Sequence, residues 1–496
     1  MTGIRENSIE LQRASFLKNY KMICLKRNIS LGSPGIKMIS LMIIFILADL
    51  LANGQSSQKA EGRRPNIIFI LTDDQRWDAL GVMGNPIIKT PHMDKLASAG
   101  ILFENSYVTT SICCVSRASI LTGQYESRHK INDFVTDLTP EALANTYPLL
   151  LKKAGYHIGF IGKYGVGVHP PFEVFDFGVN TEAGKGQPDY IIKESNGREI
   201  HETDSIDASI LKFLDEFGNK GPFCLSVSFK APHEQDGNPP EYIVQKRYEN
   251  YYKDVNIPEP VTADPEYWKS LPDFFTTSSN VGRKRWKGLF STPELYQENA
   301  KKYYQLITGV DDVIGRMVKK LSGQGLSDHT IIIFMGDNGF LMGEHGLEGK
   351  WYGYEESIRV PLFIYDPALP DKMKNIRPTQ IALNIDIAPT ILSMAGVPVP
   401  GTMQGKNLIG VLENKIPARK DFFYQHYFFG SPKIPKQEGV VTGDFKYMIY
   451  IEHHYEELYD IAHDQHETAN LVNDVRYKKK LEELRKRYKE LKSSVF

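Results

Sequence analysis

Two pairs of oxygen-bearing side chains follow long apolar runs in this sequence. Asp73 and Asp74 close the run that begins at Asn66, and Asp337 and Asn338 follow the run at 331–335. Such runs are typical of central strands in a parallel sheet, whose sites lie at the carboxyl ends of the strands. Carboxylate and amide oxygens suit a hard cation, Ca²⁺ or Mg²⁺. Either pair alone is more commonly a turn or a helix cap, so the metal hypothesis needs further site residues.

A third motif surrounds Cys113, one of only four cysteines in the chain. Taken alone, Cys113 and Cys114 are best explained as small buried thiols, because free cysteine packs well in protein cores. Ser116 and Arg117 follow, and then Leu-Thr-Gly at 121–123. This stretch resembles the signature of the type I sulfatases, C-x-P-S-R-x-x-x-L-T-G. It departs from that signature at residue 115, a valine where the family usually has proline.

The resemblance implies that Cys113 is oxidised to formylglycine by a formylglycine-generating or other sulfatase-maturing enzyme. One hydroxyl of the hydrated aldehyde would attack sulfur and displace the alcohol, and the other would expel sulfate as the aldehyde re-forms. Covalent catalysis of this kind divides one difficult step into two easier ones. The resemblance also implies a bound Ca²⁺, with Mg²⁺ as the alternative, that polarises the sulfate oxygens. Its implied ligands are Asp73, Asp74, Asp337, Asn338 and the modified Cys113.

Several cationic side chains match family positions that act on the sulfate ester. Arg117 would hold the hydrated aldehyde, because a guanidinium is permanently charged and forms a fixed fork of donors. Lys163, His233 and Lys350 would bind sulfate oxygens, and His233 or Lys350 would protonate the leaving alcohol. His345 is expected to contact the substrate. A lone lysine is normally a solvated surface charge, so these assignments depend on the motifs that flank them.

Gly165 is a second departure from the family pattern. The family often has histidine there, positioned to take a proton as the aldehyde re-forms. His169 follows four residues later, although a loop histidine before proline more commonly has a structural role. The sequence leaves open which group replaces the usual histidine.

Composition narrows the class of protein. The chain has 496 residues, a formal net charge of −1, 41% hydrophobic and 24% charged residues. It is long enough for more than one domain, and its composition is that of an ordinary globular protein. The near-zero charge supplies no field that would attract nucleic acid. The cysteines include no C-x-x-C pair, which argues against a disulfide framework or a zinc site.

Residues 1–54 are typical of a leader and signal peptide. Basic residues precede the apolar run 38–48, and small residues at 52 and 54 offer a cleavage site. That run is shorter than the ~20 residues that span a bilayer, so we expect no stable membrane span. We predict export to the periplasm or the medium. The alternatives are an interfacial anchor or an over-extended gene start.

The elements that must position these residues alternate between strands and helices, which predicts an α/β fold. We expect strands at 65–72, 157–161, 223–229, 331–335 and 362–365. Thr90 and Pro91 are predicted as N-cap and first residue of a helix, and an amphipathic helix is expected over 293–321. The resemblance implies an alkaline phosphatase-like domain at 64–400, with a large mixed, mostly parallel sheet flanked by helices. A small antiparallel sheet with a helix is expected at 401–496.

The segment 239–293 is rich in proline, tyrosine and charge, and we expect it at the mouth of the site, where loops determine specificity. Its basic run at 283–287 could hold neighbouring sulfates, or it could be an ordinary solvated face. Five aromatic residues could stack on sugar rings: Tyr251, Tyr252, Tyr267, Trp268 and Trp286.

Together these features predict an exported sulfatase that acts on sulfated carbohydrates rather than on small aryl sulfates. One alternative is a phosphonate or phosphodiester hydrolase of the same superfamily. The other is a non-catalytic glycan-binding protein, which would follow if Cys113 stays unmodified.

Overall fold

Three buried parallel strands run through the centre of the computed structural model, which describes residues 64–182, 188–193 and 197–496. β1 (Asn66–Asp73) lies between β8 (Phe223–Pro232) and β9 (Thr330–Gly336) and pairs with both in parallel. All three strands are buried along their whole length. Burial on both faces explains their uninterrupted apolar sequences.

These strands belong to a seven-stranded sheet of order β2-β12-β9-β1-β8-β4-β5. β4 (His157–Gly162) and β5 (Phe177–Asn180) continue it in parallel on one side. β12 (Leu362–Tyr365) and β2 (Ile101–Leu102) close the other side in antiparallel pairing. The predicted strands and the mixed, mostly parallel sheet are confirmed.

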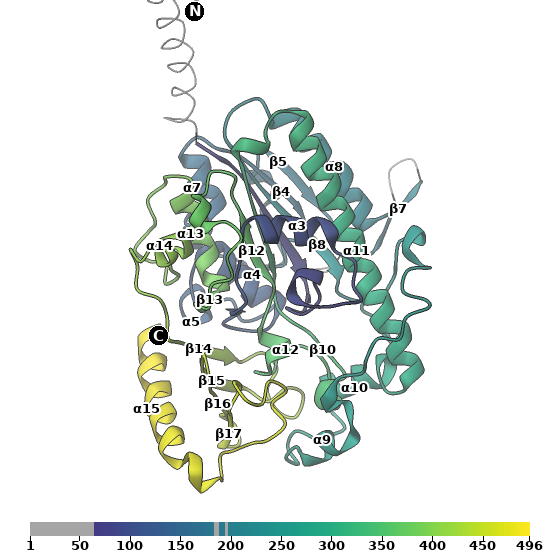
Figure 1. The fold of residues 1–496 in the computed structure, drawn as a ribbon, viewed down its shortest axis with the longest axis vertical. Coiled ribbons are helices and arrows are strands. Elements are labelled where there is room, and N and C mark those ends of the chain that lie inside the picture. Colours follow the sequence, from purple (N-terminus) through teal and green to yellow (C-terminus); the bar gives the residue numbers. More distant parts are fainter. Residues whose placement is uncertain (1–63, 183–187, 194–196) are drawn as a thin grey trace, which may run out of the picture. The chain divides into compact units, whose positions relative to one another are not determined.

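Helices cover both faces of this sheet (Figure 1). α8 (Glu202–Phe217) and α11 (Pro293–Gly323) pack on one face with Ile68 and Ile70 of β1. The other face carries Ile67, Phe69 and Leu71, and packs against α4 (Cys113–Thr122), α7 (Tyr147–Lys153) and α13 (Ile387–Met394). Alternate residues of β1 thus enter two separate cores, as the pleat of a strand requires.

α3 (Pro91–Ala99) begins where predicted, but Thr90 does not cap it with its side chain. The Thr90 hydroxyl instead donates to Asp94 and accepts from the Gly81 N–H. The first N–H groups of the helix donate to the Asp311 carboxylate of α11, His92 at 3.1 Å and Met93 at 2.7 Å. A tertiary contact has replaced the local cap.

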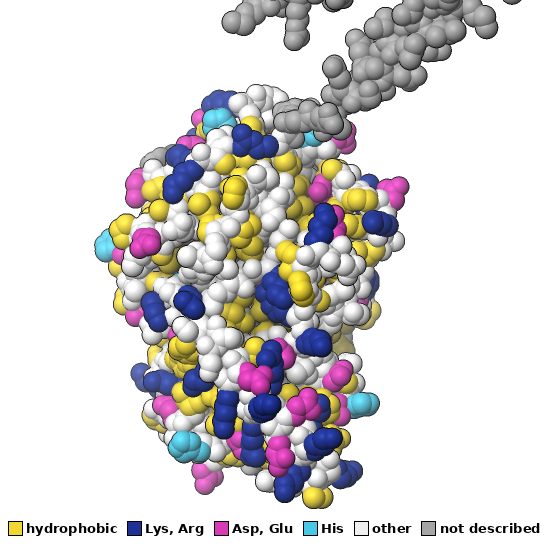
Figure 2. Space-filling model, turned by 90° about the vertical axis from the view of Figure 1, so that its left-hand side faces the viewer, with side chains coloured by type: hydrophobic (Ala, Val, Ile, Leu, Met, Phe, Trp, Pro, Cys, Tyr) yellow, Lys and Arg dark blue, Asp and Glu magenta, His cyan; other side chains and the backbone are white. Residues whose placement is uncertain are grey.

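The C-terminal part contains the antiparallel sheet β14 (Asp421–His426), β15 (Gln437–Thr442), β16 (Lys446–Tyr450) and β17 (Tyr455–Tyr459), and ends in α15 (Lys478–Val495). This confirms the small sheet with a helix. Buried Lys446 lies 2.8 Å from both Glu355 and Glu467, which ties β16 to α12 (Glu355–Ile358). In Figure 2, basic and acidic side chains are intermingled over the lower part of the face, where α15 lies.

Shorter elements complete the described chain: β3 (Ser106–Tyr107), α5 (Glu126–His129), α6 (Pro140–Ala144), β6 (Ile191–Lys193), β7 (Glu199–His201), α9 (Pro265–Ser270), α10 (Val281–Leu289), β10 (Leu341–Met342), β11 (Glu348–Gly349), β13 (Ala382–Leu383) and α14 (Leu408–Leu412).

The predicted leader at 1–54 lies outside the described residues. Within the described ranges, no helix is both long enough and apolar enough to cross a membrane. Arg64–Phe496 forms one unit, and the functional division of it at residues 400 and 401 stays a prediction.

Candidate active site

The two predicted oxygen-bearing pairs meet at the carboxyl ends of neighbouring strands. Asp73 is the last residue of β1, and Asp337 directly follows β9, its N–H donating to the Thr72 carbonyl at 2.9 Å. Asp74 has a left-handed backbone, φ 61°, which turns the chain sharply after the strand. Its N–H donates to Asp337 Oδ1 at 3.1 Å, and the Tyr303 hydroxyl donates to its carbonyl at 2.7 Å. The turn is therefore held from both sides.

Oxygen and nitrogen atoms converge at this turn in a way that fits a hard cation. Ligand atoms of Asp73, Asp74 and His233 lie within 4.8 Å of one another. Asn338 donates to Asp74 Oδ1 at 2.6 Å, and its own Oδ1, like Asp73 Oδ1, is buried with no hydrogen-bond partner among the described residues. Asp337 is close by, but its two oxygens accept from Asp74 and Arg117. The oxygen-dominated donor set suits Ca²⁺ or Mg²⁺.

His233 joins this group, whereas the sequence predicted it for sulfate binding and for protonation of the leaving alcohol. Its Nδ1 lies 2.6 Å from the Glu234 carbonyl. A carbonyl can only accept, so Nδ1 carries the proton and Nε2 of the neutral ring has a free lone pair. That Nε2 lies 3.4 Å from Asp74 Oδ2. Two acceptors at this distance repel unless a cation or a proton lies between them.

Cys113 is fully buried and is the first residue of α4, whose N-terminal end carries the positive pole of the helix dipole. Arg117 follows one turn later on the same helix. Its guanidinium donates to Asp337 Oδ2 at 2.7 Å, to the Lys163 carbonyl at 2.7 Å and to the Ser228 hydroxyl at 2.5 Å. Helix α4 thus fixes Cys113 and Arg117 relative to Asp337 at the end of β9.

Two buried lysines complete the charge balance. Lys163, after β4, pairs with Asp73, and Lys350, after β11, lies 2.7 and 2.6 Å from the two oxygens of Asp74. With Arg117 on Asp337, three cations face three carboxylates. A bound divalent cation would make this group positive overall, which favours an anionic ester.

The buried charges shift one another's ionisation. Burial raises the pKa of Asp73, but Lys163, Arg117 and Lys350 outweigh burial and hold that pKa well below its usual range. Burial raises the pKa of Asp74 to about 6 and that of Asp337 to about 7. Burial, together with Lys350, lowers the pKa of His233 well below its usual value. Burial likewise raises the pKa of the Cys113 thiol to about 11.

A cavity of about 270 Å³ opens beside these groups. It is lined by Cys113, His233 and Lys350, and by residues from α10, β11 and several loops: Phe134, Glu234, Asp236, Val281, Arg285, Phe340, Glu348, Gly349, Trp351, Phe428 and Phe429. We call it the Cys113 cavity.

His345 does not line the Cys113 cavity. Its side chain is buried, and its ring stacks on Tyr354 with centroids 4.0 Å apart. Its Nε2 has no hydrogen-bond partner among the described residues, and the expected contact with substrate stays a prediction.

Gly165 packs directly on Arg117. It has φ +69°, and a Cβ there would lie 2.6 Å from Arg117 Cδ. His169, considered as a substitute for the usual histidine, has a side chain that is 83% exposed and lies 2.8 Å from Asp137. It is a surface residue and not part of the site.

The segment 239–293 reaches the cavity through Val281 and Arg285, but not through its aromatic residues. None of its five predicted stacking aromatics lines the Cys113 cavity. Arg283 lies between Trp268 and Trp286, 4.5 and 3.6 Å from the ring centroids, and donates to the Gly346 carbonyl. Arg285 pairs with acidic residues. The expectation of a free basic subsite is therefore wrong for both arginines.

Sequence reasoning missed Glu234 and Glu348, which are buried and line the Cys113 cavity. A signal was present: Glu234 directly follows His233, and Glu348 precedes Lys350 by two residues. A charged residue inside a buried motif block is unusual enough to mark a site.

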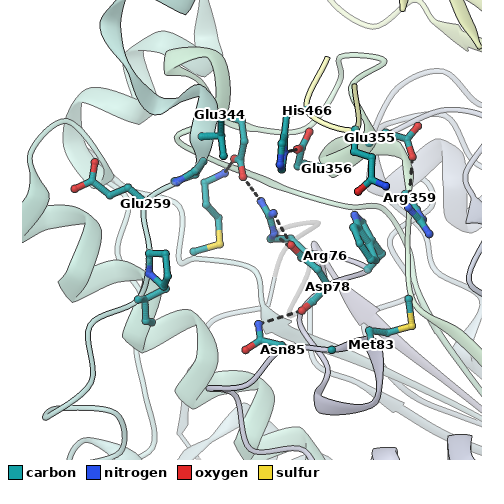
Figure 3. A pocket seen from close by; sticks show the side chains of 18 of the residues that line it. Arg76, Asp78, Met83, Asn85, Glu259, Glu344, Glu355, Glu356, Arg359 and His466 are labelled. Atoms are coloured by element: carbon teal, nitrogen blue, oxygen red, sulfur yellow. Dashed lines mark hydrogen bonds and ion pairs between the residues drawn. The ribbon is translucent and has the colours of Figure 1, made fainter. Parts of the chain in front are cut away.

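A second cavity, of about 580 Å³, lies elsewhere and includes none of the predicted site residues in its lining. Figure 3 shows Arg76 there, in ion pairs with Asp78 and Glu344 at 2.8 and 2.6 Å. These two acids neutralise the charge of Arg76. The predicted site residues Cys113, His233 and Lys350 line the smaller Cys113 cavity instead.

Comparison with known proteins agrees with this geometry. Residues 65–397 match the sulfatase family model, and residues 343–494 match the model of the N-sulphoglucosamine sulphohydrolase C-terminal region. An N-acetylglucosamine-6-O-sulfatase from Bacteroides thetaiotaomicron is 31% identical over 91% of each chain. An arylsulfatase from Clostridium perfringens is 31% identical over 85% of this chain and 93% of its own. A solved structure in complex with its substrate D-glucosamine-2-N,6-O-disulfate has a TM-score of 0.73 and 28% identity, covering 87% and 98% of the two chains.

Proposed function

The chain belongs to the sulfatase family and is a sulfuric ester hydrolase, and from this premise we propose that it hydrolyses sulfate esters of carbohydrates through a formylglycine made from Cys113 and a bound divalent cation. The observation that carries the proposal is the meeting of Asp73, Asp74 and Asn338 with three buried cations around the start of α4.

Asp73, Asp74 and Asn338 would hold the cation, with Asp337 positioned against them and the modified Cys113 completing the set. Two of the oxygens concerned, Asp73 Oδ1 and Asn338 Oδ1, have no other partner among the described residues. When bound, the cation polarises sulfate oxygens and makes the hydroxyls of the hydrated aldehyde more acidic. Ca²⁺ is the favoured ion, with Mg²⁺ as the alternative, because several protein side chains would supply the ligands, whereas Mg²⁺ usually keeps several of its waters.

The protein's own side chains bind and orient the ester. Lys163 and Lys350 lie beside Cys113 as charged ammonium groups and would bind the sulfate oxygens as charge develops on them. Lys350 is the better proton donor to the leaving alcohol, because Nε2 of neutral His233 has no proton to give. Arg117 holds Asp337 and fixes the position of α4, so its role includes positioning as well as contact with the hydrated aldehyde.

A sulfated carbohydrate is the proposed substrate class. The relative from Bacteroides thetaiotaomicron is an N-acetylglucosamine-6-O-sulfatase, and the solved relative was captured with a disulfated glucosamine. The Cys113 cavity also presents aromatic faces suited to a sugar ring: Phe134 and Phe428 have centroids 5.4 Å apart, and the Phe429 side chain is 49% exposed. Its volume of about 270 Å³ lies near the lower end of the ~300–1,000 Å³ range of small-ligand sites.

Export and maturation complete the proposal. The basic and apolar pattern within residues 1–54 supports a signal peptide that directs the protein to the periplasm or the medium. A formylglycine-generating or other maturing enzyme is then a required partner. Val115 replaces the usual proline of the signature, so the fraction of chains modified is a quantity to measure.

The test is hydrolysis by purified protein co-expressed with a maturing enzyme. We expect sulfate release from N-acetylglucosamine-6-sulfate with Ca²⁺, lower efficiency on a chromogenic aryl sulfate, and no comparable turnover of a matched phosphonate ester. Peptide mass spectrometry on the same sample reports the state of Cys113. Faster turnover of the phosphonate, or full activity with unmodified Cys113, contradicts the proposal.

A further inference from the structure

Acidic residues surround a single arginine on one wall of the Cys113 cavity. Arg285 Nε lies 2.8 Å from Glu348 Oε2, and Nη1 lies 3.4 Å from Asp236 Oδ1. The same guanidinium pairs with Glu234. Three carboxylates thus share one cation, and we call these four residues the acidic wall.

Two carboxylate oxygens of the acidic wall have no hydrogen bond. Glu234 and Glu348 are buried, and Glu234 Oε2 and Glu348 Oε1 have no partner among the described residues. A buried acceptor without a donor destabilises the protein, because the water it has lost is not replaced. Burial also raises the pKa of Glu348 against the opposing effect of Arg285. Both carboxylates therefore gain free energy from any ligand that brings a donor or a positive charge.

The acidic wall and the groups that bind sulfate face the same space. Its four members line the cavity together with Cys113, His233 and Lys350. We call the buried ion pairs beside Cys113 the floor: Lys163 with Asp73, Lys350 with Asp74 and Arg117 with Asp337. The floor balances three cations against three carboxylates, whereas the acidic wall has three carboxylates for one cation. A bound sugar must place its sulfate on the floor and its neighbouring substituents against the wall or the aromatic rings.

We propose that the acidic wall selects sugars whose other ring substituents are hydroxyl, acetamido or ammonium groups, and discriminates against a second sulfate or a carboxylate on the same ring. This inference rests on the proposed function of the Cys113 cavity. Hydroxyl and N–H donors would satisfy Glu234 and Glu348. A second anion would meet like charges in a buried, weakly screened site, where repulsion is strong. The proposal reverses the sign of the subsite expected from the basic run 283–287.

The experiment compares kcat/KM for N-acetylglucosamine-6-sulfate and D-glucosamine-2-N,6-O-disulfate in the mature, metal-loaded protein. We expect a preference for the singly sulfated sugar of at least about tenfold, which corresponds to about 1.4 kcal/mol. Glu348→Gln and Glu234→Gln keep the shape and remove the charge, so each should lower that preference by roughly three- to tenfold. Glu216→Gln, which removes an exposed charge on α8, should leave the ratio unchanged.

Asp236→Asn guards against a folding artefact, because the Asp236 side chain is 53% exposed. It should shift the ratio in the same direction by a smaller factor even if the buried Gln variants fail to fold. Equal or better turnover of the disulfated sugar by the wild type overturns the selectivity alone. An unchanged ratio of the two kcat/KM values in wall variants that fold also overturns the proposed selectivity. Failure of the wild type to release sulfate from either sugar overturns the proposed function, and this inference with it.

Discussion

The floor and the acidic wall of the Cys113 cavity lie next to each other but were predictable to very different degrees. Floor residues come from strand ends and the start of α4, where the chain path follows from the sheet. Wall residues come from α10 and from positions beside motif residues. The floor residues belong to short sequence motifs, whereas the wall residues are brought together by tertiary ion pairs with Arg285.

The two regions also treat charge differently. On the floor, each carboxylate has a cation within hydrogen-bond distance: Asp73 with Lys163, Asp74 with Lys350 and Asp337 with Arg117. On the wall, Arg285 serves three carboxylates. A balanced floor can bind a cation and a sulfate together, whereas an acid-rich wall can sort the groups attached to that sulfate. The comparison suggests that one set of residues carries out the reaction and a different set determines the substrate selectivity.

The largest expected effect is on the floor. Cys113→Ala should lower kcat by at least about 10⁴-fold, because removing a nucleophile costs that much in comparable enzymes. Cys114→Ala is the matched control, since Cys114 is equally buried but packs in the hydrophobic core. It should retain activity with a modest loss of thermal stability. Comparable losses in the two variants would show that packing, and not chemistry, explains the motif.

Asp337→Asn should lower both activity and metal affinity by about 100-fold, the upper end of the 10–100-fold effect of groups that position metal ligands. Chelation should reproduce the loss, and Ca²⁺ or Mg²⁺ should reverse it in the wild type. Asp386→Asn, which alters a buried acid paired with Arg419, should change stability without changing metal content. Metal analysis and sulfate release together decide the result, and full activity after complete chelation contradicts it.

Gly165→Ala should lower kcat by roughly 10–100-fold, because the new Cβ would displace Arg117, which positions Asp337. Gly155→Ala is the control: Gly155 also has positive φ, +86°, but a Cβ there meets nothing within 4 Å. Both changes should cost about 1–2 kcal/mol of stability through backbone strain, and only Gly165→Ala should slow turnover. Equal kinetic effects would remove the steric explanation for this glycine. Gly165→His carries the same clash, so it cannot simply restore a missing imidazole.

Sequence alone could predict the central strands because continuous apolar runs have few other uses in a chain of this size. The family resemblance implied that Asp73, Asp74, Asp337 and Asn338 lie together, and the fold explains this, because parallel strands bring their carboxyl ends to one edge of the sheet. Sequence alone could not place Arg283 between Trp268 and Trp286, or Arg285 among three acids, since such pairings depend on where α10 docks. Nor could it show that the His345 ring stacks on Tyr354.

A smaller effect is expected at the rim of the cavity. Phe429→Ala should raise KM for a sulfated sugar by roughly fivefold, in line with about 1 kcal/mol for an aromatic contact. Tyr251→Ala is the control, because Tyr251 was an expected stacking residue but lines a different groove, with Lys253 and Gln305. Steady-state kinetics on a sugar sulfate and an aryl sulfate separate the two. A larger effect from Tyr251→Ala would show that the sugar binds against the aromatic residues of segment 239–293 instead.

The smallest effect is expected at His169. Its side chain is 83% exposed and lies 2.8 Å from Asp137, which also accepts from the N–H groups of Val168 and His169. Surface changes of this kind are usually within about 0.5 kcal/mol, so His169→Ala should alter turnover by less than about twofold at every pH measured. Asp137→Asn is the informative partner, because it perturbs the same loop and leaves the imidazole in place. If His169→Ala alone flattens the pH profile of sulfate release, the loop moves into the Cys113 cavity during turnover. The description of His169 as a surface residue outside the site is then wrong.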